Sequence, residues 1–251
     1  IQYPEQSDLA LERKLEEKYG LTEALIAVPA YEQSSDQEVA FQAVDYILRV
    51  LKKNMVFGMT WGRAMHEFVE QLAKDERLRS LSFQNVKVVP FLGTPGAIQS
   101  DSWNTTTYSN TLATKVGNLL HCASYNLSAP MYVEGTKEKG LIESIDEIAK
   151  VLHMAETADI ALIGIGSMQD DSSIIKAEIR TKEEYKELVR KGAVGEIVGR
   201  IYDKNGQTVD EDLKRKWLEF HWIRSQRYQS ESECLMEKIR SKQSKVRSQV
   251  D

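Results

Sequence analysis

Residues 54–72 read NMVFGMTWGRAMHEFVEQL, and two different hydrophobic patterns follow each other within this segment. The run from Asn54 to Phe57 is short and largely apolar, which favours a buried strand. From Met65 to Leu72 the apolar residues recur at intervals of three and four, which is typical of one face of a helix. A turn with two glycines joins the two patterns. The segment therefore predicts a strand, a tight turn and an amphipathic helix.

The same alternation continues on both sides of this segment. Ser35, Ser144 and Thr181 are each followed by Glu three residues later, a capping-box signal for a helix start. We expect helices over residues 9–19, 35–51, 65–72, 110–120, 144–156 and 181–191, strands over residues 25–29, 54–57, 86–92, 158–165 and 194–202, and a hairpin turn at residues 203–206. Strands that alternate with helices predict an α/β fold with a mostly parallel, Rossmann-like sheet and helices on both faces.

The overall composition is that of an ordinary soluble domain. The 251 residues include 28% charged residues and have a formal net charge of −5, which argues against a surface dedicated to nucleic acid. There is no apolar run of about 18 residues that would predict a membrane helix, and no signal-peptide pattern. The four histidines and two cysteines lack metal-ligand spacing. We therefore expect no metal, no cofactor, no membrane partner and a cytoplasmic location.

The turn after the first of these strands has the residues that a phosphate site needs. Gly58 and Gly62 allow the backbone to approach a ligand closely, and the start of the following helix offers N–H groups and a positive dipole. Thr60 adds a hydroxyl and Arg63 adds a fixed positive charge. Trp61 lies between these two residues and belongs to the same candidate site. An ordinary strand-to-helix turn explains the same glycines equally well, so both readings stay open.

A second glycine pair follows the apolar run of residues 158–165. Gly164 and Gly166 would let the backbone surround a ligand, and the Ser167 hydroxyl can donate to it. A Gly-x-Gly pair alone is weak evidence, and an ordinary turn is the more common explanation.

Two further polar groups are candidates for contacts with hydroxyl groups. Gly93 and Thr94 open a long polar loop that contains Gln99 and Asp101, and such loops are often functional. Glu196 lies at the start of a predicted strand, where a carboxylate can bind hydroxyls or act as a general base. The alternatives are a solvated loop and an exposed glutamate at a strand end.

Taken in order, these segments resemble the sugar-binding domain of the SorC family of transcriptional regulators. The resemblance covers about residues 9–213. The motifs that carry it are Leu11-Glu12-Arg13-Lys14-Leu15, Tyr19-Gly20-Leu21, Val28-Pro29, Gly58-x-Thr60-Trp61-Gly62, Val88-Val89-Pro90-x-x-Gly93, Asn110-Thr111-Leu112-Ala113, Ala129-Pro130, residues 158–167 and Ala193-Val194-Gly195-Glu196-x-x-Gly199-Arg200-x-x-Asp203.

The resemblance implies a fold similar to the glucosamine-6-phosphate deaminase and ribose-5-phosphate isomerase group. It also implies a phosphorylated sugar effector, a homo-oligomer (dimer or tetramer), and operator DNA bound only through an N-terminal helix-turn-helix domain that this chain lacks. By position, Thr60 and Gly62 match the family's phosphate-gripping turn, and Gly93 matches the start of its hydroxyl-reading loop. Gly166 and Glu196 match other pocket positions.

Residues 214–251 depart from the family's pattern. They contain ten Lys or Arg against five Asp or Glu, and the family's glycine-rich turn ending in Lys has no counterpart there. Residues 216–223 and 236–240 can be encoded so that one other frame reads the family's expected residues. We therefore predict an effector-binding domain over residues 1–213 and an atypical basic tail over residues 214–251, produced by a frameshift near residues 213–216. A native basic helix is the alternative.

Three functions remain open from the sequence. The first is a ligand-sensing regulator domain without catalytic residues. The second is a sugar-phosphate isomerase or deaminase on the same fold, for which Glu196 is the one fair candidate base. The third is an inactive remnant, if the shifted frame lies in the genome.

Overall fold

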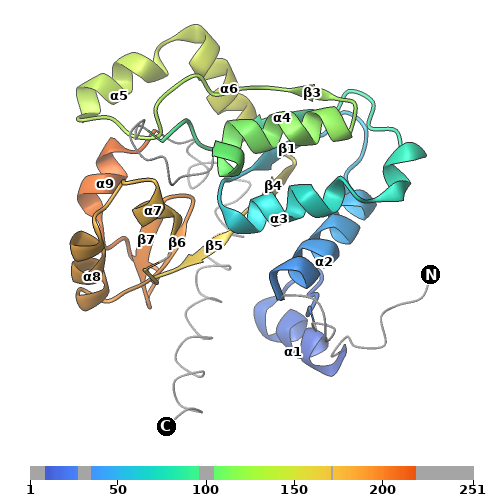
Figure 1. The fold of residues 1–251 in the computed structure, drawn as a ribbon, viewed down its shortest axis with the longest axis horizontal. Helices are drawn as coiled ribbons and strands as arrows, with labels where there is room; N and C mark the ends of the chain where they lie inside the picture. The colour runs from blue at the N-terminus through green and yellow to red at the C-terminus, as the bar shows by residue number, and fades with distance from the viewer. Residues whose placement is uncertain (1–8, 28–34, 96–104, 171, 219–251) are drawn as a thin grey trace.

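The computed structural model describes residues 9–27, 35–95, 105–170 and 172–218, and the arrangement of their helices and strands is drawn in Figure 1. In chain order the helices are α1 (Leu9–Tyr19), α2 (Ser35–Val50), α3 (Arg63–Leu72), α4 (Ser109–Leu119), α5 (Thr136–Glu143), α6 (Asp146–Glu156), α7 (Ser173–Lys176), α8 (Lys182–Arg190) and α9 (Glu211–Lys216), with 3-10 turns η1 (Glu76–Arg79) and η2 (Thr105–Thr107). The strands are β1 (Val56–Met59), β2 (Lys87–Pro90), β3 (Ala123–Ser124), β4 (Ile160–Leu162), β5 (Ile165–Ser167), β6 (Ala193–Ile197) and β7 (Arg200–Asp203).

The main sheet has four parallel strands in the order β3-β2-β1-β4. β1 is central, and its Phe57 lies opposite Val88 of β2 and Ile160 of β4. The strand order reverses at β1, because β2 and β3 lie on one side of it and β4 lies on the other. In open α/β sheets such a reversal leaves a crevice at the carboxyl ends of the two strands concerned.

Helices cover both faces of this sheet, which confirms the predicted α/β architecture (Figure 1). α2, α3 and α4 share one buried apolar cluster with Phe57 and Met59 of β1. α6 contributes to a second cluster on the opposite face, together with the smaller sheet. Successive residues of β2 face opposite sides of the sheet: Val88 belongs to the first cluster and Val89 to the second.

α1 has the predicted bounds, but the strand predicted for residues 25–29 is wrong where the structure describes it. Residues 21–27 form no strand. The backbone N–H groups of Ala24 and Ile26 instead donate to the carboxylates of Glu16 and Glu12, at 2.9 Å and 2.8 Å. With these donors satisfied by α1, the segment has no need of a neighbouring strand. Residues 28 and 29 lie outside the described residues.

Two predicted strands are each divided in the structure. The run over residues 158–165 supplies β4 to the main sheet and then, after Gly164, enters β5 of a second sheet. The run over residues 194–202 is a hairpin of β6 and β7, turned by Val198 and Gly199, whose φ angles are 52° and 78°. Positive φ at two successive residues matches the type of turn that joins antiparallel strands closely. The second sheet is antiparallel, in the order β5-β6-β7.

The three capping boxes have different outcomes. The box at Thr181 is confirmed, because its hydroxyl accepts from the Glu184 N–H and the Glu184 carboxylate accepts from the Thr181 N–H. The box at Ser144 is wrong, because this hydroxyl donates to the Leu141 carbonyl at the end of α5, and no side chain caps α6. α2 begins at Ser35 itself, so Ser35 is the first residue of the helix and not the residue before it, as the predicted box requires.

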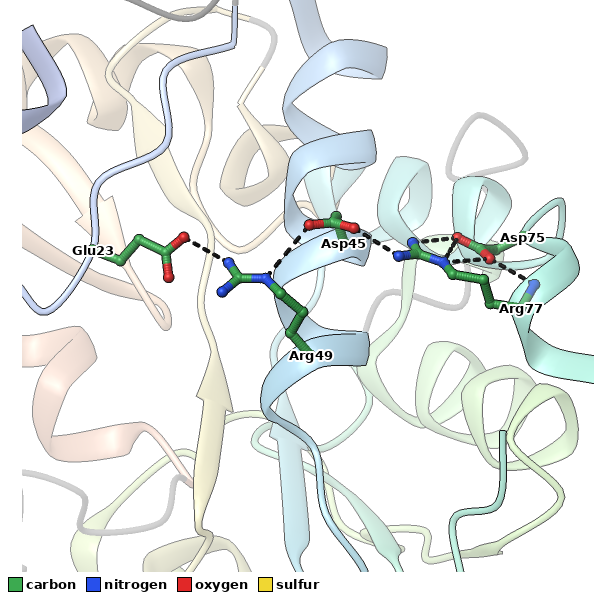
Figure 2. Close-up of polar contacts among 5 residues, drawn as sticks. All are labelled: Glu23, Asp45, Arg49, Asp75 and Arg77. Carbon is green, nitrogen blue, oxygen red and sulfur yellow. Dashed lines mark hydrogen bonds and ion pairs between the residues drawn. The ribbon is translucent and has the colours of Figure 1, made fainter. Parts of the chain in front are cut away.

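An ion-pair chain ties three segments of the N-terminal half together, as Figure 2 shows. Glu23 accepts from Arg49 of α2 at 2.6 Å, and Arg49 pairs with Asp45 one turn earlier at 3.5 Å. Asp45 accepts from Arg77 of η1 at 2.6 Å, and Arg77 also pairs with Asp75 at 2.7 Å. Charges therefore alternate without interruption from the segment after α1 to the turn after α3.

Packing continues beyond α9 to Leu218. Trp217 is fully buried, stacks on Tyr132 with ring centroids 6.5 Å apart, and fills the space beside Gly199. The Leu218 N–H donates to the Met131 carbonyl at 2.8 Å. Residues 219–251, most of the predicted basic tail, lie outside the described residues.

Candidate functional site

A pocket of about 230 Å³ lies where the carboxyl ends of β1 and β4 meet the first turn of α3. This is the crevice that the reversed strand order predicts. Its volume is below the roughly 300–1,000 Å³ typical of sites for drug-sized ligands, so it suits a small metabolite. The lining residues are Asp36, Thr60, Trp61, Gly62, Arg63, Ala64, Gly164, Ile165, Gly166, Ser167, Ser172, Ser173, Glu196 and Val198.

The start of α3 is built to present backbone N–H groups to the pocket. Gly62 is its N-cap residue, with φ 103° and ψ 179°, a conformation that essentially only glycine adopts. The N–H groups of the first turn have no intrahelical acceptor, as at any helix start, and no side chain of the N-cap residue accepts from them. Gly62 is itself anchored, because its N–H donates to the Thr107 carbonyl at 3.0 Å. Helix starts of this kind bind anions, and Arg63 adds a positive charge at the first helical position.

Thr60 joins the ends of β1 and β4. Its N–H donates to the Leu162 carbonyl at 3.2 Å, and its hydroxyl oxygen accepts from the Gly164 N–H at 3.3 Å. Thr60 is 1% exposed, so both bonds are shielded from water. A hydroxyl that accepts one bond keeps its own proton for another acceptor.

Glu196 forms the buried end of the pocket. It lies opposite Gly166 in the β5–β6 pairing, and a side chain at position 166 would place its Cβ 2.6 Å from the Glu196 carboxylate. Burial raises the pKa of Glu196 to about 7, although the hydrogen bond from the Gly199 N–H opposes this shift. Burial, with a smaller effect of the Glu196 charge, raises the pKa of Tyr202 to about 12. Glu196 can therefore donate or accept a hydrogen bond near neutral pH.

Eight of the thirteen predicted site residues line this pocket. They are Thr60, Trp61, Gly62, Arg63, Gly164, Gly166, Ser167 and Glu196.

Three other predicted site residues, Gly58, Gly93 and Thr94, do not line this pocket. Gly58 is in the middle of β1, where an added Cβ would lie 2.0 Å from the Phe91 ring, so glycine is needed there for packing. Gly93 lies against the Ala129 carbonyl, 2.2 Å from an added Cβ, and neighbouring Thr94 donates its N–H to the same carbonyl. Gln99 and Asp101 lie outside the described residues.

Six lining residues escaped the sequence analysis. Only Ser172 had a recognisable signal, because a serine before Ile174 and Ile175 is a helix-start pattern, and its hydroxyl does cap α7 by accepting from the Ile175 N–H. Asp36 belongs to the first turn of a helix distant in sequence from the glycine turns. The complete set is Asp36, Ala64, Ile165, Ser172, Ser173 and Val198.

A larger depression of about 420 Å³ lies between α8 and α9, and we assign it no ligand. Its one arginine, Arg180, is held by Asp210 through two hydrogen bonds of 2.9 Å and 3.0 Å. Most of its other charged lining residues are acidic. Over the described ranges, no three His, Cys, Asp or Glu side chains are grouped to hold a metal ion, and no helix is long and apolar enough to cross a membrane.

Comparison with known proteins identifies a matching family model and similar proteins. The Sugar-bind family model, which describes a sugar-binding domain, matches residues 3–221. The sorbitol operon regulator of Klebsiella pneumoniae is 28% identical over 232 residues, which cover 91% of this chain and 71% of that protein. The deoxyribonucleoside regulator of Bacillus subtilis is 26% identical over 200 residues, which cover 78% of this chain and 60% of that protein.

Solved structures of regulators share the fold. The full-length sorbitol operon regulator SorC from Klebsiella pneumoniae superposes with a TM-score of 0.72 at 26% identity, covering 88% of this chain and 68% of that one. A probable sor operon regulator from Shigella flexneri gives a TM-score of 0.71 at 24% identity, covering 85% of this chain and 80% of that one. The chain thus spans 60% to 71% of the two curated relatives named above.

Proposed function

This chain belongs to the Sugar-bind family, the sugar-binding domain of SorC-type transcriptional regulators, and we propose that it senses a small phosphorylated sugar or polyol. In this proposal the ligand controls DNA binding by a longer protein that carries a separate DNA-binding domain. The regulator acts in the cytoplasm as a dimer or tetramer of identical chains.

The observation that supports this proposal best is the composition of the pocket at the start of α3. The uncapped first turn and Arg63 supply positive potential for a phosphate. Ser167 and Ser173 supply hydroxyls, and Glu196 supplies a carboxyl group that can bond to sugar hydroxyls. The first turn of α3 is therefore suited to an anion, with the Ser173 hydroxyl beside Gly62, and Ser167 and Glu196 are suited to hydroxyl groups.

The names of these relatives narrow the panel of ligands to try. They refer to a sorbitol operon, to deoxyribonucleosides and, in a regulator from Brucella abortus that is 20% identical over 206 residues, to erythritol catabolism. The panel therefore pairs sorbitol 6-phosphate, deoxyribose 5-phosphate and erythritol 4-phosphate with their unphosphorylated forms.

A thermal-shift measurement of the purified chain tests the proposal. A ligand that binds the folded state adds about 2.7 kcal/mol of stability at a hundredfold excess over its Kd, so the melting midpoint rises. We expect a rise with a phosphorylated member and none with its unphosphorylated partner. Arg63→Ala should weaken that binding by about 1–3 kcal/mol, while Arg79→Ala, which removes an exposed arginine away from the pocket, should leave it unchanged.

Two results would contradict the proposal. One is a cooperative melt that no phosphorylated member shifts. The other is an equal shift by the phosphorylated and unphosphorylated forms, because the phosphate would then make no contribution.

An enzyme on the same scaffold is the second candidate, and the pKa of Glu196 favours it. A carboxyl group with a pKa of about 7 suits a general base at neutral pH. Against it, the described lining contains no His, Lys, Cys or Tyr, and its one other carboxyl group, Asp36, is exposed to solvent. NMR spectra of the panel incubated with the protein decide the matter: turnover that Glu196→Gln abolishes would replace the sensor by an isomerase or deaminase.

A further inference from the structure

The pocket lining contains more acidic than basic side chains. The lining contains one cation, Arg63, and two carboxyl groups, Asp36 and Glu196. Glu196 is 7% exposed and bonded to the Gly199 N–H, whereas Asp36 is exposed to solvent. A pocket with one anion-binding end thus has acidic groups at two other positions on its wall.

Asp36 is held in the wall by the packing of its helix. It lies in the first turn of α2, and α2 shares a buried cluster with α3 through residues that include Val44, Ile47 and Phe68. Figure 1 shows the two helices lying against each other. Because both are fixed to the same cluster, the position of Asp36 relative to the first turn of α3 is set before any ligand arrives.

The Asp36 carboxylate makes no hydrogen bond or ion pair within the described residues. A carboxylate with unused acceptor positions can take hydrogen bonds from ligand hydroxyls. The same charge repels a second anionic group at that place, because like charges a few ångströms apart disfavour each other even near the surface. Both effects favour a ligand that places hydroxyl groups, and not a second anionic group, beside Asp36.

We propose that Asp36 is a specificity-determining residue, which selects ligands with one phosphate and free hydroxyl groups over ligands with two phosphates. The phosphate lies at the first turn of α3, and the hydroxyl-bearing part of the ligand faces Asp36. This inference rests on the proposed function, since it assumes that a phosphorylated sugar or polyol enters the pocket.

Calorimetric titration with sorbitol 6-phosphate and sorbitol 1,6-bisphosphate tests the inference. The wild-type chain should bind the monophosphate more tightly. Asp36→Asn should reduce this preference about fivefold to tenfold, mainly by tightening the binding of the bisphosphate. Because the effect is electrostatic at an exposed group, the wild-type preference should also shrink as salt is raised from about 0.05 M to 0.5 M, and the variant's preference should change less.

Two variants act as controls. Asp36→Glu keeps the charge and should keep the preference. Glu38→Gln removes the same charge from the same helical turn, but Glu38 is bonded to Gln42 at 3.2 Å and does not line the pocket. It should leave the preference unchanged, which separates a contact with the ligand from a general effect of net charge.

The outcomes distinguish this inference from the proposed function. Monophosphate binding with a preference that Asp36→Asn leaves unchanged, or that Glu38→Gln changes equally, overturns the role of Asp36 alone. If neither the wild type nor Asp36→Asn binds either compound, and no panel member shifts the melting midpoint, the proposed function and the inference both fail.

Discussion

Replacing Glu196 by Gln should remove a pH dependence from the stability of the folded chain. Burial holds the pKa of Glu196 at about 7, against an ordinary value of 4.5. Between these two pH values the folded state keeps a proton that the unfolded state has released. The stability that this proton provides is fully present below pH 4.5 and is lost as the pH rises through 7.

The size of the effect follows from the shift. Each pKa unit corresponds to about 1.4 kcal/mol, so Glu196 should lower the free energy of unfolding by about 3 kcal/mol between pH 4.5 and 7.5. Glutamine has the same shape and no ionisation in this range. The stability of Glu196→Gln relative to wild type should therefore rise by that amount over the same interval, whatever constant offset its amide group introduces.

Urea unfolding, followed by circular dichroism at half-unit steps from pH 4.5 to 7.5, measures this difference. Glu183→Gln, at an exposed position on α8, provides a control for removing a carboxylate elsewhere. The reasoning would be refuted by stability curves of wild type and Glu196→Gln that run parallel over the whole range. Parallel curves would mean that the carboxylate is ionised and solvated in the folded state.

Two further predictions come from local structure and a third comes from the sequence. Gly58→Ala should lower the free energy of unfolding by about 1–3 kcal/mol, because its Cβ would overlap the Phe91 ring, and Phe91→Leu should restore part of the loss in urea unfolding. Thr181→Ala should cost about 1 kcal/mol by removing the α8 capping box, and earlier hydrogen exchange of the Glu184 N–H would report it. DNA sequencing of the gene should reveal a displaced frame near the codons of residues 213–216; an uninterrupted frame would exclude it.

Long helices were predictable because their apolar residues recur with a period that few other structures share. The four buried residues of α3 all lie at the predicted positions. α1 has its predicted bounds for another reason: its buried residues are Glu12 and Tyr19, and Gly20, with φ 58°, ends it as predicted. Strand limits were less predictable, because an apolar run does not reveal where the chain leaves one sheet for another. The short helices α5 and α7 escaped for a related reason: each has one or no buried residue and therefore no clear periodic face.

The centre of the candidate site was predictable because chemistry and chain position agree there. A glycine turn at the end of a strand, a hydroxyl and an arginine occur together in residues 58–63. Gly58 and Gly93 look the same in the sequence as ligand-binding glycines, but the space beside them is filled by Phe91 and by a backbone carbonyl. Asp36 was not predictable, because only the packing of α2 against α3 brings it to the pocket.

The ion-pair chain has a consequence for how the molecule opens. Its arginines are more than 40% exposed, and pairs of that kind typically contribute about 0–1 kcal/mol each. Of the residues described, those of α1 belong to neither large buried cluster, whereas α2 belongs to one. α1 should therefore separate from the domain at a small fraction of the free energy of global unfolding, leaving α2 in place. In native-state hydrogen exchange its amides would lose protection first, and the break would fall between Glu23 and Arg49.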